Sequence, residues 1–311
     1  MELLVNQSRR DFLKTTSASL ICGSTLLSSA TAFAKGLKLP LGLQLYSVRD
    51  LLPKEFAGTL KQLGALGFVE VESAGYYDHS AKEVKSALNA AGLKLVSAHY
   101  ASDPLHEKFD EILAFNHELG VSTIVCSSPG FKNPARVKGM GWAERNHAMT
   151  IDDWHWNAEQ FNIFGEKVKS AGMSFGYHNH IAEFRVTDGL VPYDELLRLT
   201  DPSKVTMEMD CGWVTVGGGN PIEYLRKHAS RISMLHVKDF VGLVKPVAGK
   251  EAPEPKPVEL GTGTIDYAPI FAEAAKGGNI KHIFVEQEAF TVPPMQSLKM
   301  DADYMRKLGV A

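Results

Sequence analysis

The sequence has few cysteines, little net charge and no long apolar run, and each shortage excludes a class of protein. Among its 311 residues are three cysteines, and the formal net charge is −3. Cys126 and Cys211 lie in apolar, strand-like runs, so we predict buried free thiols and not a disulfide framework. Without a cluster of basic residues the chain is a poor candidate for binding nucleic acid.

The first 34 residues have the order of a secretory signal: a charged start, a short apolar stretch rich in Ser and Thr, and small residues at the end. The adjacent Arg9 and Arg10 resemble a twin-arginine signal. We therefore predict cleavage after Ala34, export to the periplasm and no stable membrane anchor afterwards, because the apolar stretch is short. Since this route carries folded proteins, a metal ion could be loaded inside the cell.

From residue 35 to 311, short apolar runs alternate with amphipathic segments, several of which end in glycine, a common helix stop. The expected strands are 41–48, 68–73, 93–100, 122–128, 174–180, 205–211, 232–240 and 282–288. Eight strands alternating with eight helices predict a single-domain (β/α)₈ TIM barrel. A doubly wound sheet usually has a glycine fingerprint after its first strand, and this sequence has none there.

Four consecutive expected strands end in polar residues two positions apart, which share a face of a strand. These pairs are His178 and His180, Glu208 and Asp210, His236 and Lys238, and Glu286 and Glu288. Earlier strands add Gln44, Glu72 and His99. One buried histidine is usually a satisfied core residue, but charged groups are rarely buried in numbers without partners or a metal. The mixture of imidazoles and carboxylates predicts one divalent ion: Mn, Co, Zn or Mg.

Two long segments, 129–153 and 241–264, follow the fourth and seventh strands, at the barrel face where active sites form. The first segment and the residues after it contain Trp142, Arg145, Trp154 and Trp156. These side chains could stack on a sugar or simply hold the loop in place. The run 261–264, "GTGT", could bind phosphate or form a tight turn. Both alternatives stay open at this point.

The motifs "YHNH" (177–180), "EMDCGWV" (208–214), "LHVKDF" (235–240), "LGTGTIDY" (260–267) and "FVEQE" (284–288) occur in the expected strand order. With them, residues 39–311 resemble the xylose isomerase-like TIM-barrel superfamily, which includes sugar isomerases and epimerases, inosose dehydratases and endonuclease IV. The resemblance implies one metal ion held at the ends of strands five to eight. The matching positions here are His178, Asp210, His236 and Glu286. Glu286 and Glu288 share a face, and the motif alignment favours Glu286.

His178 stands where the sugar epimerases of this superfamily have a glutamate that also moves a proton, which puts simple 3-epimerisation in doubt. The histidine-rich strand is more similar to the inosose dehydratase and keto-sugar lyase branches. In those branches a histidine two residues past the ligand is a plausible base, and here that residue is His180. The resemblance implies proton abstraction beside a carbonyl through an enediolate. Glu183, Glu208 and Lys238 are candidate acid partners or substrate contacts, and further candidate contacts are Gln44, Glu72, His99, Trp142 and Glu288.

Our first hypothesis is a metal-dependent isomerase or epimerase acting on an unphosphorylated sugar or polyol, since phosphosugars are mainly intracellular. The alternative is a lyase, dehydratase or glycoside-cleaving enzyme that acts on a keto-sugar through the same intermediate. An endonuclease IV-like nuclease and a non-catalytic sugar-binding barrel are two further alternatives. Family members are often oligomeric, so the resemblance also allows a homo-oligomer.

Overall fold

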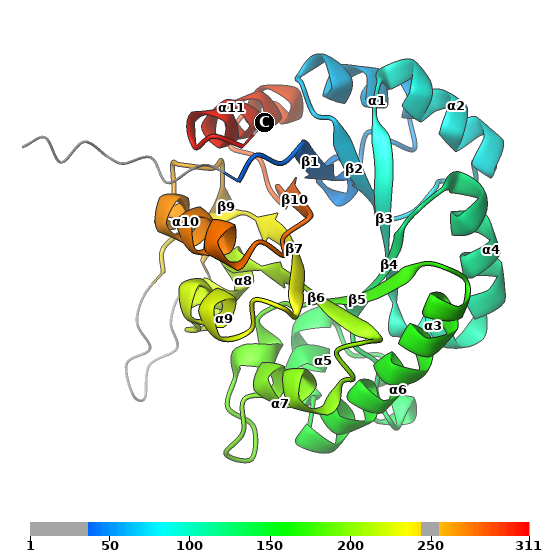
Figure 1. Cartoon of the computed structure of the whole chain (residues 1–311), viewed down its shortest axis with the longest axis vertical. Helices are drawn as coiled ribbons and strands as arrows, with labels where there is room; N and C mark the ends of the chain where they lie inside the picture. Colours follow the sequence, from blue (N-terminus) through cyan, green and yellow to red (C-terminus); the bar gives the residue numbers. More distant parts are fainter. Residues whose placement is uncertain (1–36, 244–254, 311) are drawn as a thin grey trace, which may run out of the picture. The chain divides into compact units, whose positions relative to one another are not determined.

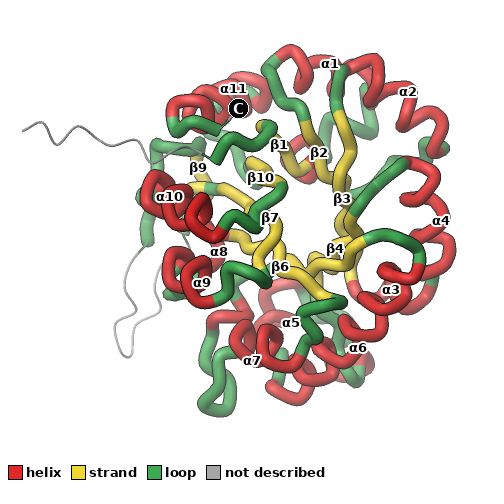
Figure 2. Tube along the Cα trace, in the orientation of Figure 1, coloured by secondary structure: helices red, strands yellow, loops and turns green. Residues whose placement is uncertain are grey.

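The computed structural model describes residues 37–243 and 255–310, and these form a closed barrel of eight parallel strands inside a layer of helices (Figures 1 and 2). The predicted TIM barrel is confirmed. The predicted signal, residues 1–34, lies outside the described residues, so its cleavage and export stay predictions. Within the described ranges, none of the helices combines the length and apolarity that crossing a membrane requires.

The eight barrel strands correspond to the eight apolar runs, although most are shorter. They are β1 Leu41–Gln44, β2 Glu70–Ser73, β3 Lys94–Ala101, β4 Thr123–Ser128, β5 Ser174–His178, β6 Val205–Asp210, β7 Ile232–Val237 and β10 His282–Val285. Each strand pairs with its neighbours in sequence order, and β10 closes the ring by pairing with β1 and β7. All eight carboxyl ends therefore open on the same side of the barrel.

The strand expected at 232–240 is divided in the structure. Barrel strand β7 stops at Val237, and β8 (Asp239–Val241) pairs antiparallel with β9 (Lys256–Val258) outside the barrel. The Asp239 side chain accepts backbone N–H groups from four residues: Phe240, Gly261, Gly263 and Ile265. Two of these bonds come from Gly261 and Gly263 of the "GTGT" run, and the Thr262 and Thr264 N–H groups donate to backbone carbonyls, so all four amides of the run are occupied. Together these bonds favour a turn at 261–264 over a phosphate loop, because no amide of the run is left for a phosphate.

The helices surround the barrel, and the eight expected ones are all present (Figure 1). They are α1 Phe56–Ala65, α2 Ala81–Ala91, α4 Phe109–Leu119, α6 Ile151–Ser170, α7 Pro192–Leu199, α9 Pro221–Lys227, α10 Tyr267–Gly277 and α11 Pro294–Lys307. Three short helices were not expected: α3 Ser102–Glu107, α5 Trp142–Ala148 and α8 Cys211–Val216. Helix α2 shows why its sequence folds this way, because Ser80 and Glu83 form a capping box and Gly92 ends the helix at φ 68°.

Below the polar strand ends, the barrel interior is filled by a small apolar cluster that is separate from the main core. Its members are Val96, Val125, Met234 and Phe284, each no more than 2% exposed. Gly42 faces Phe284: a Cβ on Gly42 would lie 2.6 Å from Phe284 Cδ1 and would also clash with the Ile283 carbonyl oxygen. A glycine on β1 thus makes room for the largest side chain of this layer.

The first long loop is held against the barrel by residues of α6. Asn157 accepts the Gly130 N–H and donates to the Gly130 carbonyl, both at 2.8 Å. Trp154 is only 1% exposed, and Trp156 stacks on His106 at 5.3 Å between ring centroids. Trp156 also packs against Gly130 of the loop, and neither tryptophan lines the two cavities of the candidate site, so both have a packing role. Trp142, in contrast, is 52% exposed.

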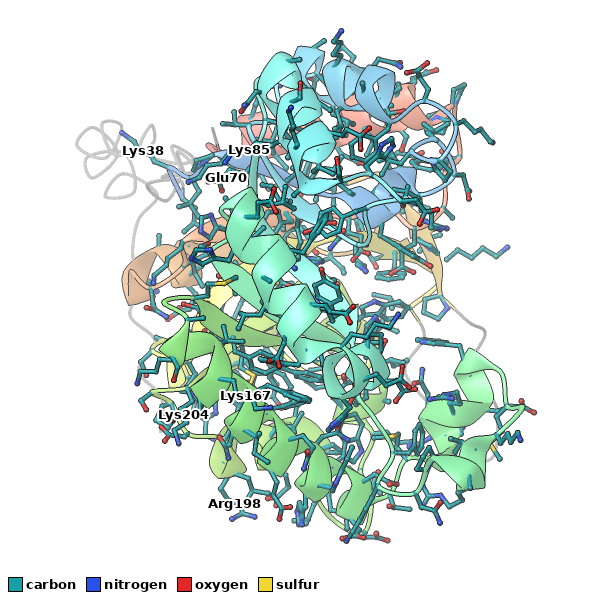
Figure 3. The ribbon with its side chains drawn as sticks, turned by 90° about the vertical axis from the view of Figure 1, so that its right-hand side faces the viewer. Lys38, Glu70, Lys85, Lys167, Arg198 and Lys204 are labelled. Carbon is teal, nitrogen blue, oxygen red and sulfur yellow. The ribbon has the colours of Figure 1, made fainter. Side chains whose placement is uncertain are left out.

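On the outer surface, charged side chains of the helical layer form ion pairs in solvent. Arg198 bonds Glu195 within α7, and Lys204 lies 3.0 Å from Glu166 of α6; Figure 3 labels Arg198 and Lys204. Exposed pairs of this kind usually contribute less than about 1 kcal/mol. The charged groups of the candidate site lie inside the barrel.

Candidate metal centre and active site

Four side chains at the ends of β5, β6, β7 and β10 converge on one point. They are His178, Asp210, His236 and Glu286, all buried, with one ligand atom from each lying within 4.8 Å of the others. Ligand atoms bound to a single ion at about 2.1 Å lie at most about 4.2 Å apart, so small side-chain movements would suffice. The mixture of nitrogen and oxygen donors suits Zn²⁺, Co²⁺ or Mn²⁺.

Asp210 is oriented by its place at the junction of β6 and α8. Its Oδ1 caps the helix by accepting the Trp213 N–H at 2.7 Å, while its buried Oδ2 faces the Lys238 ammonium at 3.1 Å and His178 Nε2 at 3.9 Å. Asn179 accepts the Asp210 N–H at 3.0 Å and donates to the Asp210 carbonyl oxygen. The asparagine between the two histidines therefore joins β5 to β6. The Asp210 side chain is turned toward the other three members of the cluster, with Oδ2 paired to a cationic side chain.

Lys238 places an ammonium group beside this cluster. Its Nζ lies 3.1 Å from Asp210, 2.7 Å from Glu286 and 2.5 Å from Glu288. Burial lowers the pKa of Lys238, but the three carboxylates outweigh burial and hold the pKa well above its usual value. The structure also distinguishes the two glutamates: Glu286 belongs to the four-residue cluster, whereas the Glu288 side chain bonds Lys238 and is outside that cluster.

Three residues expected to contact substrate, Gln44, Glu72 and Glu208, are instead 0% exposed and line neither cavity of the site. Glu72 accepts hydrogen bonds from Gln44 at 2.7 Å and from His236 at 2.8 Å. Glu208 lies 3.1 Å from His178 Nδ1. Their side chains point into the closed barrel, where Glu72 from β2 and Glu208 from β6 approach the same two histidines, His99 and His236.

His99 bridges this buried layer and the larger cavity. Its Nε2 lies 2.7 Å from Glu72 and 2.6 Å from Glu208. Burial lowers the pKa of His99, but the two carboxylates outweigh it and raise the pKa to about 9. His99 together with His178, Glu208 and His236 forms a second group that could hold a metal ion.

His180 stands at the barrel mouth, beside but outside the metal cluster. Burial, reinforced by the Lys238 ammonium, lowers the pKa of His180 to about 3, so the imidazole is neutral near pH 7. Glu183 accepts the His180 N–H at 2.9 Å and the Tyr177 hydroxyl at 2.5 Å. Burial raises the pKa of Glu183. Glu183 thus holds the backbone that carries His180.

Two cavities meet at His180, Trp142 and Ser128. The larger, about 570 Å³, is lined by candidate residues His99, His178, His180, Trp142, Glu286 and Glu288. The smaller, about 330 Å³, is bordered by Arg145 and Glu183 as well as the shared residues. The candidate residues chosen from the sequence therefore line both cavities.

Trp213 is a cavity residue that the sequence reasoning did not select. It lines the larger cavity, and Lys238 Nζ lies 5.2 Å from its ring centroid. Its ring is also 6.1 Å from that of His180. The available signal was its position three residues after Asp210 in "EMDCGW", where the turn that caps α8 returns the chain to the barrel mouth.

The two cysteines of the described ranges are free and buried, as predicted. Burial raises the pKa of the Cys126 thiol to about 12 and that of Cys211 further. Neither thiol is therefore a nucleophile near neutral pH.

Comparison with known proteins decides the family. The xylose isomerase-like TIM barrel family matches residues 59–308. The chain belongs to this family. Inosose dehydratase of Clostridium beijerinckii is 29% identical over 248 residues, covering 75% of this chain and 82% of that protein. Inosose dehydratase of Geobacillus thermodenitrificans is 26% identical over 270 residues, covering 81% and 89%.

A solved structure from Parabacteroides distasonis, described as a sugar phosphate isomerase/epimerase, has a TM-score of 0.67 and 28% identity. The match covers 86% of this chain and 97% of that one. These relatives confirm the prediction of an enzyme of the xylose isomerase-like superfamily. Two of these relatives are named as dehydratases and the third as an isomerase/epimerase.

Proposed function

We propose that this protein is a divalent-metal-dependent enzyme that removes a proton beside the carbonyl of an unphosphorylated keto-sugar or keto-polyol and then eliminates a β-oxygen substituent. The observation that carries the proposal is the position of His180, whose imidazole lines the larger cavity beside the cluster of His178, Asp210, His236 and Glu286. An imidazole at this position can accept a proton from a bound substrate, and an ion held by the adjacent cluster would stabilise negative charge on a substrate oxygen.

His178, Asp210, His236 and Glu286 would hold the ion, which when bound supplies Lewis-acid polarisation of the carbonyl. Manganese, cobalt, zinc and magnesium remain the candidate ions. Lys238 itself is buried and lines neither cavity, but its ammonium contacts Glu286 and Glu288, which line the larger one. Lys238 would therefore supply a proton through its contacts with these glutamates. His180 as base and Lys238 as acid would serve the two ends of an elimination.

Elimination is favoured over epimerisation because a histidine replaces the β5 glutamate that serves sugar epimerases. If His178 binds an ion through one ring nitrogen and donates its N–H to a carboxylate through the other, neither nitrogen is free to accept a proton from the substrate. The inosose dehydratases that match three quarters or more of this chain support the same choice. Cleavage of a keto-glycoside is the same reaction with an alcohol as leaving group.

The second candidate is an isomerase or epimerase, supported by the name of the Parabacteroides distasonis protein. It requires a proton to return to the same carbon or its neighbour. Lys238 is the group that could deliver it, since its ammonium lies near enough to His180 to lower the pKa of that imidazole. Export through the twin-arginine route, a periplasmic location and a homo-oligomer remain further proposals.

The first test is the metal content of residues 35–311, measured by mass spectrometry beside an Asp210→Ala, His236→Ala double variant. We expect about one equivalent of divalent metal in the wild type and none in the variant. Three equivalents would favour an endonuclease IV-like cluster. Absence of metal even after reconstitution with Mn²⁺, Co²⁺ and Zn²⁺ would leave a non-catalytic sugar-binding barrel.

A second test separates elimination from isomerisation. Keto-inositols, keto-sugars and keto-glycosides are incubated with enzyme in D₂O and followed by NMR. Elimination releases water or an alcohol and gives an unsaturated ketone or its tautomer. Isomerisation or epimerisation introduces deuterium without loss of a substituent, and this result would replace the first proposal with the second.

A further inference from the structure

Beneath the four-residue cluster lies a second buried layer that the proposed reaction does not use. It consists of Glu72 on β2, His99 on β3 and Glu208 on β6, with Gln44 of β1 bonded to Glu72. Both glutamates are 0% exposed. Buried carboxylates at this depth are costly unless each has a specific partner, so their partners indicate what they do.

Both candidate histidine ligands connect the two layers through their opposite ring nitrogens. His178 lies 3.9 Å from Asp210 through Nε2 and 3.1 Å from Glu208 through Nδ1. His236 lies 3.0 Å from Glu286 through Nδ1 and 2.8 Å from Glu72 through Nε2. In each ring one nitrogen faces the metal cluster, and the other faces a buried carboxylate.

We propose that Glu72 and Glu208 are positioning residues that select the tautomer and ring orientation of His236 and His178 for metal binding. A neutral imidazole has one N–H and one lone pair. A carboxylate behind the ring takes the N–H, which leaves the lone pair of the other nitrogen directed into the cluster. The same contact increases the basicity of the coordinating nitrogen.

His99 and Gln44 complete this layer by holding the two carboxylates. His99 Nε2 lies between Glu72 and Glu208, and its ring stacks on His236 at 5.3 Å with an interplanar angle of 8°. Gln44 donates to the same Glu72 oxygen that faces His236. Together these contacts restrict how far either carboxylate can move away from the ligand histidines.

A second metal ion is the competing explanation. His99, His178, Glu208 and His236 meet the geometric requirement, and the buried atoms Glu72 Oε2 and Glu208 Oε1 lack hydrogen-bond partners among the described residues. Two ions at once, however, would require both shared histidines to lose their N–H protons and act as bridging imidazolates. The two possible metal sites share His178 and His236, so an ion in one site disfavours an ion in the other. This favours a single ion, with the hydrogen-bonded residues behind it.

Cobalt binding to the metal-stripped full chain tests this inference, which rests on the proposed metal cluster. The dissociation constant is measured by calorimetry, and the visible absorption bands of Co²⁺ report its coordination. Glu208→Gln and Glu72→Gln should each weaken Co²⁺ binding about 10–100-fold and alter the bands. Glu208→Asp, which keeps a carboxylate, should recover part of the affinity.

The matched control is Glu70→Gln. Glu70, labelled in Figure 3, is a buried carboxylate on the same strand as Glu72, bonded to His282 at 2.7 Å but belonging to neither metal group. Its variant should bind Co²⁺ like the wild type. If one glutamine variant fails to fold, as judged by circular dichroism, the other still tests the positioning role, because Glu72 contacts His236 and Glu208 contacts both His178 and His236.

Three results have different meanings. Wild-type protein that binds no Co²⁺ overturns the proposed function itself and, with it, this inference. Wild-type binding that is unchanged in both glutamine variants overturns only the positioning role. Two equivalents of Co²⁺ in the wild type, with one lost in Glu208→Gln, would establish the second ion and also overturn the positioning role.

Discussion

Two layers of inward-facing residues lie one above the other in the barrel, and they differ completely in chemistry. Met234 and His236 are two residues apart on β7, as Phe284 and Glu286 are along the chain at β10, so strand geometry places each pair on one face. The lower members join the apolar cluster with Val96 and Val125, and the upper members join the metal cluster. The same backbone register thus serves packing below and chemistry above.

The difference shows where stability and function are separated in this fold. Apolar burial in the lower layer stabilises the barrel, by roughly 1.5–3 kcal/mol for each large side chain. The upper layer concentrates buried carboxylates, imidazoles and an ammonium, which are tolerated because they pair with one another. Substitutions in the lower layer should therefore mainly change the free energy of unfolding, and substitutions in the upper layer should mainly change activity or metal binding.

The largest effect is expected for His180→Ala in the upper layer. Loss of the proposed base should lower kcat about 10²–10⁴-fold, while metal content and the urea midpoint of unfolding stay close to wild type. Single-turnover kinetics on the substrate found by the NMR screen measures the effect. His155→Ala, which removes an imidazole bonded to Glu195 on the outer helices, is the control. A loss below tenfold would contradict the assignment of His180.

Phe284→Ala in the lower layer should have the opposite profile. Removing a fully buried ring leaves a cavity beside Gly42 and should lower the free energy of unfolding by about 3–5 kcal/mol. Urea unfolding followed by circular dichroism measures this loss. The protein that remains folded should still bind about one equivalent of metal. Stability within 1 kcal/mol of wild type would mean that the lower layer does not support the barrel.

Removal of the metal ion should lower the free energy of unfolding, because an ion that binds only the folded protein stabilises it. An ion that binds only the folded state, present at 100 times its dissociation constant, adds about 2.7 kcal/mol to the free energy of unfolding. We expect this gain when Zn²⁺ or Mn²⁺ is added to chelator-treated protein. The Asp210→Ala, His236→Ala variant should show no gain. An equal gain in both proteins would place the stabilising ion elsewhere.

Asp301 on α11 tests what a buried acid does without a nearby cation. Burial raises its pKa to about 7, a shift that its bond from the Leu260 N–H opposes and that nearby Glu259 increases. The folded state therefore holds a proton that the unfolded chain releases near pH 4. Stability should fall as pH rises from about 4 to 7, on the order of 1 kcal/mol per pH unit.

Asp301→Asn should flatten this dependence, because asparagine keeps an acceptor for Leu260 but carries no charge at any pH. Chemical unfolding of both proteins at several pH values between 4 and 8 provides the measurement. Metal content should not change, since Asp301 belongs to neither metal group. A variant whose stability follows the same pH curve as the wild type would show that other groups cause the dependence.

Much of the architecture could be predicted from the chain alone because its signals are local. Apolar runs at barrel spacing indicated eight strands, and caps such as Ser80 and Gly92 marked helix ends. The two-residue spacing of His236 and Lys238 predicted a shared direction toward the barrel mouth. The family motifs added the candidate ligands, and the structure brings all four within one small cluster.

The depth of each polar side chain was decided by tertiary structure. The two-residue alternation of side chains along a strand places Gln44, Glu72 and Glu208 on the inward face. Only closure of the barrel puts them beneath the candidate ligands and away from the cavities. Likewise, Trp142 and Trp154 look equivalent in sequence, yet one lines the cavity and the other lies in the core. Sequence spacing specifies direction within one strand, whereas depth depends on how neighbouring strands are staggered around the closed barrel.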